Sequence, residues 1–460
     1  MNSQQQERRE LIRLTLPILA TQLAQVGMGT VDTVLSGHVS TRDLAAVAIG
    51  TSVWLPVWMF LAGLLSVLAP LIAKSVAKAR FDSSPSSAPL AADLLRQGSR
   101  LGLISGSLLG ALLFASSWPL KLLIDDAATA EITQEYLMMV ALGFPAVGYF
   151  LALRFYGEAT GAAARITGIM LLGLLANIPV SAALVQGWFG LPALGGMGCG
   201  LGTSLVFFAL AFSIRKLISC PAESDPNLNS SANSQITTSP SQIPALLKLG
   251  LPVGIAVFFE VSLFTVIALF LTDLGPAIVA GHQVALNVSS ITFMLPLSLG
   301  LALTVRVGHH TGTGHFHTAR STAWLGVKLN LLLALFNATL ITLFANPIAN
   351  LYSIDPQVVE IGSGLLIFAA IFQLSDATQI AAAAALRGYQ DTLAIMLVTF
   401  VCYWLVGLGG GYWLAMVGWS GVGLEPQGAK GFWTGLIIAL TLAAIALGWR
   451  LNRVSAKAID

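Results

Sequence analysis

The sequence predicts an all-helical integral membrane protein, with twelve transmembrane helices in two pseudo-symmetric six-helix bundles around a central cavity. Charge is scarce, because the 460 residues include only 23 Lys and Arg and 21 Asp and Glu, where a soluble protein of this length carries about 115. Hydrophobic residues make up 56% of the chain, and the mean hydropathy is +0.81. This surplus of apolar surface indicates a lipid environment. Two further observations, twelve apolar stretches and an internal repeat, define the arrangement of the helices.

Several functional classes are excluded by composition. A net charge of +2 without a basic tract argues against nucleic acid as a partner. Three scattered cysteines form neither a disulfide framework nor a metal-ligand spacing: Cys199, Cys220 and Cys402. The four histidines at positions 309, 310, 315 and 317 are expected in a solvated loop rather than at a metal. No clustered catalytic set is present, so we expect no enzyme and no cofactor. The first apolar run is too long for a signal peptide.

Each predicted helix corresponds to an apolar stretch of about 20 residues or more, the length that crosses a bilayer. The first six stretches are 11–37, 44–73, 94–118, 132–153, 166–186 and 195–217. The second six are 245–272, 277–305, 322–345, 357–386, 393–417 and 430–451. These twelve stretches leave no room for a folded soluble domain.

A long polar stretch separates the two sets of six. Residues 219–243 are rich in Ser, Asn and Pro, a composition typical of a flexible linker. We therefore expect an N-terminal lobe over 1–218, a cytoplasmic linker over 219–243 and a C-terminal lobe over 244–460.

The orientation follows from the basic residues. Of the 23, 19 fall on the side that the two termini and the linker share, and three fall on the opposite side. Because cytoplasmic loops carry the excess of Lys and Arg, we expect both termini in the cytoplasm. The chain is then a multi-pass protein of the cell inner membrane, surrounded by lipid, and we expect it to act as a monomer.

An internal repeat relates the two halves. The segment Leu11–Pro17 (LIRLTLP) aligns with Leu246–Pro252 (LLKLGLP) at an offset of 235 residues. The segment LRFYGE at 153–158 aligns with LRGYQD at 386–391 at an offset of 233. At that same offset three glycines align with three glycines: Gly195, Gly198 and Gly202 with Gly428, Gly431 and Gly435. Copies separated by six spans have the same orientation, a parallel repeat about an axis along the membrane normal.

Two similar bundles joined by a flexible linker favour a transporter over a channel. In such an architecture a cavity between the bundles opens first to one side of the membrane and then to the other. The sequence therefore predicts alternating access.

Three carboxylates lie inside predicted spans: Asp32, Glu260 and Asp376. A charged carboxylate at the bilayer centre costs about 2.5–3.5 kcal/mol on insertion scales, so such residues are functional candidates by default. Counting from the nearest basic residue places Glu260 and Asp376 about 17 Å from the cytoplasmic side, near the midplane. Asp32 falls in the outer part of the first span. By the repeat, Gln25 is equivalent to Glu260.

Neutral oxygens and aromatic rings accompany these acids. The candidate polar residues are Gln25, Asn177, Gln283 and Asn287, and the candidate cavity aromatics are Phe259, Phe264, Phe293 and Phe372. Carboxylates among aromatic faces suit amphipathic organic cations, through charge pairing and cation–π contact. The same acids can take up a proton or a metal cation when the organic cation leaves.

Several of these motifs together resemble the multidrug and toxic compound extrusion (MATE) family, NorM subgroup. They are VDT at 31–33, FEV at 259–261, GHQVALN at 281–287, Asp376 within 373–379, and LRGY at 386–389. The resemblance covers essentially the whole chain. It implies an inner-membrane antiporter that exports organic cations, dyes and fluoroquinolone-type compounds in exchange for H⁺ or Na⁺. It also implies a cation site at Glu260 and Asp376 and a polar site at Asp32 and Asn177.

One departure from the family pattern concerns the coupling ion. Phe293 and Phe372 stand where some relatives carry tyrosines near the cation. Because Na⁺ needs several oxygen ligands and a proton needs one base, the departure favours H⁺ while leaving Na⁺ open. The only metal expected is Na⁺ at Glu260 and Asp376.

Other classes of membrane protein remain to be weighed. A lipid or glycolipid flippase of related fold is the nearest alternative, and it would need a more basic cavity. A major-facilitator transporter also has six plus six spans, but the stretch AKSVAKARF at 73–81 lacks that family's loop signature. A membrane-embedded enzyme is the alternative from a different class.

Overall fold

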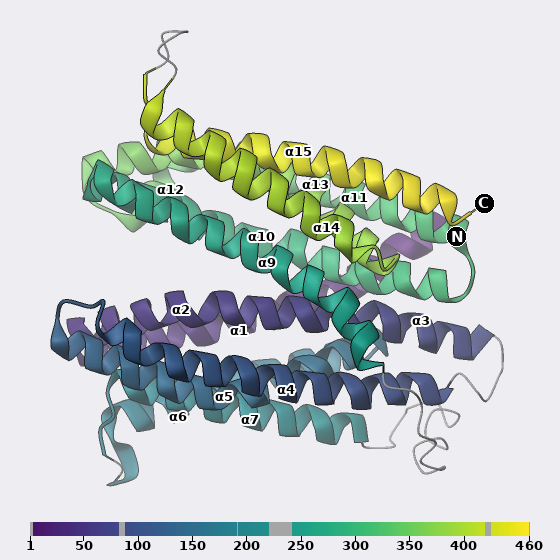
Figure 1. Cartoon of the computed structure of the whole chain (residues 1–460), viewed down its shortest axis with the longest axis horizontal. Coiled ribbons are helices and arrows are strands. Elements are labelled where there is room, and N and C mark those ends of the chain that lie inside the picture. Colours follow the sequence, from purple (N-terminus) through teal and green to yellow (C-terminus); the bar gives the residue numbers. More distant parts are fainter. Residues whose placement is uncertain (1–2, 82–87, 191, 220–241, 419–424, 460) are drawn as a thin grey trace. The chain divides into compact units, whose positions relative to one another are not determined.

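A computed structural model describes residues 3–81, 88–190, 192–219, 242–418 and 425–459, and most of these residues are helical (Figure 1). Within these residues, twelve helices are long and apolar enough to cross a membrane. Each coincides with one of the twelve predicted stretches, so the predicted fold class is confirmed. Most of the expected linker 219–243 lies outside the described residues.

Contacts divide the chain into two compact units: Pro17–Gly254, here the N-terminal unit, and Met1–Leu16 together with Ile255–Asp460, here the C-terminal unit. The first helix, α1 (Ser3–Val39), and the first helix after the linker, α9 (Ile243–Leu271), each pass from one unit to the other. Each contains a proline near this point, Pro17 or Pro252. Proline removes a backbone hydrogen bond and permits bending there.

In the N-terminal unit, α5 (Ala127–Ala159) is the central helix and packs against α2, α4 and α7. The other elements are α2 (Thr41–Ser66), α3 (Leu68–Phe81), α4 (Ala88–Lys121), α6 (Ala163–Gln186), η1 (Trp188–Gly190) and α7 (Gly196–Ser219). Figure 1 shows α4 to α7 running alongside one another.

In the C-terminal unit, α13 (Pro356–Gly388) takes the same central place and packs against α10, α11 and α15. The other elements are η2 (Thr272–Leu274), α10 (Pro276–Gly312), α11 (Phe316–Leu343), α12 (Ala345–Tyr352), α14 (Thr392–Thr399), η3 (Phe400–Gly410), η4 (Trp413–Val417) and α15 (Ala429–Lys457). The two units therefore share one packing scheme.

Backbone geometry at the aligned glycines repeats as well. Gly195 precedes α7 with φ 54°, and Gly428 precedes α15 with φ 55°. The Gly195 amide donates to the Val185 carbonyl, and the Gly428 amide donates to the Ala415 carbonyl. Because glycine adopts positive φ at little cost, these positions explain why glycine occurs in both copies.

The eleventh span differs from the regular helix that the sequence predicts. After α14 it continues as two π-helical segments, η3 and η4. A π-helix is a rare, wider winding that is frequent at functional sites, and no residue pattern marks it in advance. Tyr403, fully buried, lies in the first of these segments.

Close contact between α4 and α5 depends on a glycine stripe on α4. The stripe consists of Gly98, Gly102, Gly106 and Gly110, one residue per helical turn. A Cβ added at Gly102 would overlap the backbone carbonyl of Gly148 on α5, and one at Gly106 would overlap the carbonyl of Phe144. Small residues at such spacing let membrane helices approach closely.

We expect Gly102→Ala to lower the thermal unfolding midpoint of the purified protein. The added methyl meets backbone, which cannot rotate away, so overpacking costs about 1–3 kcal/mol. Gly168→Ala on α6 is the matched control, because a Cβ there meets nothing within 4 Å. Equal midpoints for the two variants, measured by tryptophan fluorescence in detergent, would show that the stripe does not control this packing.

Candidate functional site

Asp32 lies in a buried polar network of the N-terminal unit. It is 4% exposed on α1. Its Oδ2 accepts a 2.5 Å hydrogen bond from Thr203 Oγ1 of α7, and its Oδ1 accepts one of 3.4 Å from Ser181 Oγ of α6. Asn177 Nδ2 donates to the same Ser181 hydroxyl at 3.2 Å. The structure thus brings Asp32 and Asn177 together through Ser181.

Thr203 is a residue that the sequence reasoning missed. It follows a glycine-rich stretch, residues 195–202, and nothing in the sequence distinguishes its hydroxyl from the many others in the spans. Its distance of seven residues from Gly196, at the start of α7, puts it about two turns into the helix.

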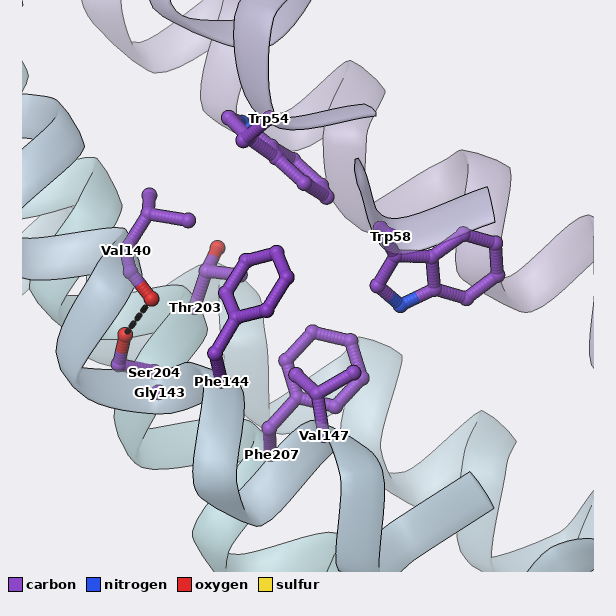
Figure 2. A pocket seen from close by; sticks show the side chains of 9 residues that line it. All are labelled: Trp54, Trp58, Val140, Gly143, Phe144, Val147, Thr203, Ser204 and Phe207. Atoms are coloured by element: carbon purple, nitrogen blue, oxygen red, sulfur yellow. Dashed lines mark hydrogen bonds between the residues drawn. The ribbon is translucent and has the colours of Figure 1, made fainter. Parts of the chain in front are cut away.

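An aromatic pocket lies next to this network (Figure 2). Trp54 and Trp58 of α2 face Phe144 of α5 and Phe207 of α7 across it. The pocket also includes Val140, Gly143, Val147, Thr203 and Ser204, and its volume is about 10 Å³, room for about one water molecule. Because Thr203 both lines the pocket and donates to Asp32, a group bound in the pocket can influence the Asp32 carboxylate.

Glu260 of α9 and Asp376 of α13 form a carboxylate pair in the C-terminal unit. They interact electrostatically with each other, and both interact with Tyr403. Arg387, at the end of α13, interacts with Glu260. The two acids that the sequence places near the midplane therefore interact within one unit. Tyr403 was missed, because it lies in a span with no charge to mark it.

The face of α13 around Asp376 presents oxygens without hydrogen-bond partners. Gln373 Oε1, Asp376 Oδ1 and Gln379 Oε1 are buried, and none accepts a hydrogen bond within the described residues. Their spacing of three places them along one face of the helix. Such oxygens suit a proton or a hard monovalent cation. No group of three or more His, Cys, Asp or Glu suited to a transition metal occurs in the described parts of the chain.

Two of the predicted aromatics pack near this face. Phe372, buried on α13, lies 6.1 Å from the Phe264 ring and 5.8 Å from the Trp433 ring, between ring centroids. Trp433 Nε1 in turn hydrogen-bonds His282 Nδ1 at 3.2 Å. These contacts make a compact aromatic cluster beside Asp376.

Phe259 belongs to a second aromatic group. Its ring lies 5.2 Å from that of Phe400 and 5.8 Å from that of Trp404. Phe293 is half-buried on α10. Gln283 and Asn287, also on α10, are exposed one turn apart, and no described contact joins them to the carboxylate pair.

Gln25 has a different role from that of Asp32. Its Oε1 accepts a 3.3 Å hydrogen bond from Arg154 Nη1. Arg154 is 2% exposed and forms a 2.7 Å ion pair with Glu158. Arg154 and Arg387 are among the 19 basic residues that the sequence assigns to the cytoplasmic side, but both are buried in protein.

Three further buried acids were not anticipated. Glu158 pairs with Arg154, and Asp43 accepts hydrogen bonds from Ser40 and from the Gly196 amide. The third, Glu7, lies in the first turns of α1. All three lie just outside the predicted apolar stretches, where loops are expected. The helices of the structure extend past those stretches and include these acids.

Glu7 at the start of α1 pairs with two residues of α10. It accepts a 2.5 Å bond from Arg306 and lies 3.2 Å from His310 Nε2. The expectation of a solvated histidine loop is wrong for His309 and His310, because α10 continues to Gly312 and His310 is buried. The start of the chain is thereby fastened to the C-terminal unit.

Comparison with known proteins identifies the family. The family described as MatE matches residues 17–183 and 252–413. "Multidrug resistance protein NorM" of Photobacterium profundum is 38% identical, and the alignment covers 99% of this chain and 98% of that protein. "Multidrug resistance protein PmpM" of Pseudomonas aeruginosa is 41% identical, with 98% and 93% covered.

A solved structure has the same fold. It is described as the outward-facing conformation of a multidrug resistance MATE family transporter of the MOP superfamily. The TM-score is 0.84 at 18% identity, over 98% of this chain and 96% of that one. The family match over most of the chain, together with the two full-length relatives, shows that this protein belongs to the MATE family of membrane transporters.

Proposed function

We propose that this protein is a multidrug efflux antiporter, which exports organic cations and fluoroquinolone-type compounds in exchange for H⁺ or Na⁺ by alternating access. The observation that carries the proposal is the carboxylate pair, Glu260 and Asp376. The relatives named as multidrug resistance proteins support the substrate class.

Asp376 differs from three other buried acids of the protein, Glu7, Glu158 and Asp43. Glu7 and Glu158 each have a basic partner at hydrogen-bonding distance, and Asp43 has a backbone amide. Asp376 keeps an oxygen without any donor in the described chain, and a like charge lies near it. Since a buried charge without a partner is costly, Asp376 is stabilised when the site binds a cation, which is the property that coupling requires.

The aromatic pocket of the N-terminal unit supports organic cations as substrates. Four aromatic side chains line this pocket, and the space between them is about 10 Å³, far below the roughly 300–1,000 Å³ typical of drug sites. An organic cation therefore binds between these side chains only when they move apart. Binding of a cationic ring there favours ionised Asp32 through Thr203, whereas protonation of Asp32 disfavours it.

Driving forces of ordinary size suffice for this exchange. One pH unit supplies about 1.4 kcal/mol, and 100 mV supplies about 2.3 kcal/mol for each charge moved. Exchange of one proton for one monovalent organic cation moves no net charge, so the pH gradient alone drives it. With a second coupling ion the exchange would move net charge, so the membrane voltage would add to the driving force.

The sequence supports a proposal for the domain organisation, the membrane topology and the location of the protein. We propose lobes at 1–218 and 244–460 that rearrange about the linker 219–243, both termini in the cytoplasm, an inner-membrane location and a monomeric transporter. Accessibility labelling of single cysteines placed near each terminus in intact cells tests this topology.

The coupling ion is tested by drug efflux from proteoliposomes under one gradient at a time. We expect ethidium transport under a pH gradient alone, consistent with phenylalanines at 293 and 372. Transport under a Na⁺ gradient alone would assign Na⁺ instead. Transport of a labelled lipid with no movement of ethidium under either gradient would favour the flippase.

Trp54→Leu is expected to raise the apparent KM for ethidium about five- to thirty-fold. A cation–π contact in a desolvated site contributes about 1–2 kcal/mol, and Trp54 lines the pocket. The control is Trp118→Leu, because Trp118 is half-exposed on α4 and packs against Phe114. Equal KM values for the two variants would remove the pocket from the proposal.

A further inference from the structure

Arg154 shows how a buried arginine is held in the N-terminal unit. Its Nε pairs with Glu158 Oε1 at 2.7 Å, its Nη2 donates to Gln22 Oε1 at 2.7 Å, and its Nη1 donates to Gln25 Oε1 at 3.3 Å. All three guanidinium nitrogens therefore have fixed partners. A buried arginine of this kind is structural.

The internal repeat places Arg387 at the equivalent position of the C-terminal unit. The equivalents of the three partners of Arg154 follow from the same alignment: Glu158 corresponds to Asp391, Gln22 to Val257 and Gln25 to Glu260. Two amides in one half are thus replaced by an apolar side chain and a carboxylate in the other.

Arg387 does not have the fixed partners that Arg154 has. The helix α13 ends at Gly388 and the chain turns at Gln390 with φ 66°, whereas α5 continues to Ala159. Asp391 is consequently not one helical turn from Arg387, and it pairs with Arg450 at 2.6 Å. Val257 offers no acceptor.

The guanidinium of Arg387 is therefore left with the carboxylate pair. Arg387 is 7% exposed, and its Nε and Nη2 have no hydrogen-bond partner in the described chain. It interacts electrostatically with Glu260. Glu260 in turn interacts electrostatically with Asp376 and Tyr403. A buried cation with unsatisfied donors next to an acid is arranged to compete with any other cation for that acid.

We propose that Arg387 is a built-in counter-cation of the carboxylate pair, which neutralises Glu260 when the coupling ion has left and thereby sets the affinity of the site for that ion. Arg387 is a positioning residue, since it acts through Glu260. This inference rests on the proposed coupling role of Glu260 and Asp376.

Charge arithmetic gives the inference a second consequence. Two ionised carboxylates and one guanidinium have a net charge of −1, which one monovalent cation neutralises. Without Arg387 the charge is −2, and the site would hold its first cation more tightly. A neighbouring opposite charge changes the cation affinity of a carboxylate about tenfold or more.

The experiment is an ion titration of the purified full-length protein, read by intrinsic tryptophan fluorescence. Trp404 is a suitable reporter, because its Nε1 donates to the Phe259 carbonyl at 3.2 Å, next to Glu260 in the chain. Na⁺ is titrated at fixed pH, and separately pH is titrated in choline chloride. For Arg387→Gln we expect the midpoint to move about tenfold lower in Na⁺, or about one unit higher in pH, according to which ion binds.

Three variants separate charge from packing. Arg387→Met is a second uncharged variant that places no unpaired polar group in the interior, and it should shift the midpoint in the same direction. Arg387→Lys keeps the charge and should stay within about threefold of the wild type. Arg450→Gln removes a half-exposed arginine that pairs with Asp391 and should leave the midpoint unchanged.

The outcomes distinguish this inference from the proposed function. A signal that depends on Glu260 but has the same midpoint in Arg387→Gln and Arg387→Met as in the wild type overturns the inference alone. An equal shift in Arg387→Lys also overturns it, because the charge is then not responsible. A titration that Glu260→Gln leaves intact refutes the ion site itself.

Discussion

Glu260→Gln and Asp376→Asn are each expected to abolish resistance to ethidium and to reduce drug efflux from proteoliposomes to the level of liposomes without protein. Both substitutions keep the size of the side chain and remove its ability to bind and release a cation. Because each acid lies close to the other, the pair works as one site, and either loss is sufficient. The measurement is the minimal inhibitory concentration in an efflux-deficient host, together with membrane expression.

The matched controls are exposed acids of the same unit. Glu360→Gln on α13 and Asp273→Asn in η2 make the same chemical changes at exposed positions. Both should retain wild-type resistance. Wild-type efflux from Glu260→Gln and from Asp376→Asn would leave the carboxylate pair without a role in coupling.

Arg154→Gln is expected to destabilise the protein by about 3–5 kcal/mol. Removal of one partner of a buried ion pair leaves the other charge uncompensated, and both Arg154 and Glu158 have side chains that are 3% exposed. The large loss should appear as a reduced yield of folded protein and a lower thermal midpoint. Arg387→Gln, which breaks no fixed pair, should lose far less.

A double variant tests the reason for this loss. Replacing the pair together, as Arg154→Met with Glu158→Leu, leaves no unpaired charge and should recover much of the stability of the single variant. If the double variant is less stable than Arg154→Gln, the loss of stability in Arg154→Gln comes from altered packing rather than from the unpaired carboxylate of Glu158.

The spans were predictable because lipid imposes length and hydropathy on them. The ends of the helices were harder to predict. Polar residues near those ends, such as Glu7, Asp43 and Glu158, have partners within the protein, and the helices therefore extend past the apolar stretches. The π-helical winding of η3 and η4 depends on packing and has no local signature.

The part of the candidate site that could be predicted consists of acidic residues deep inside membrane spans, where a charge is costly. Asp32, Glu260 and Asp376 stand out in the sequence for that reason. Thr203 and Tyr403 do not, because hydroxyl groups are common in membrane helices and only the fold shows which of them face an acid. The arginines at 154 and 387 were read as surface markers, since the sequence alone does not show that acids and amides come from distant helices to meet them.

The most direct test of coupled exchange is counter-transport without an ion gradient. Proteoliposomes containing a pH-sensitive dye are given a gradient of ethidium only, and a parallel set contains a Na⁺ indicator. The account predicts that ethidium movement drives H⁺ or Na⁺ in the opposite direction in the wild type, and that Glu260→Gln shows no such ion flux. Ethidium movement without ion flux, or an ion flux that persists in Glu260→Gln, would contradict it.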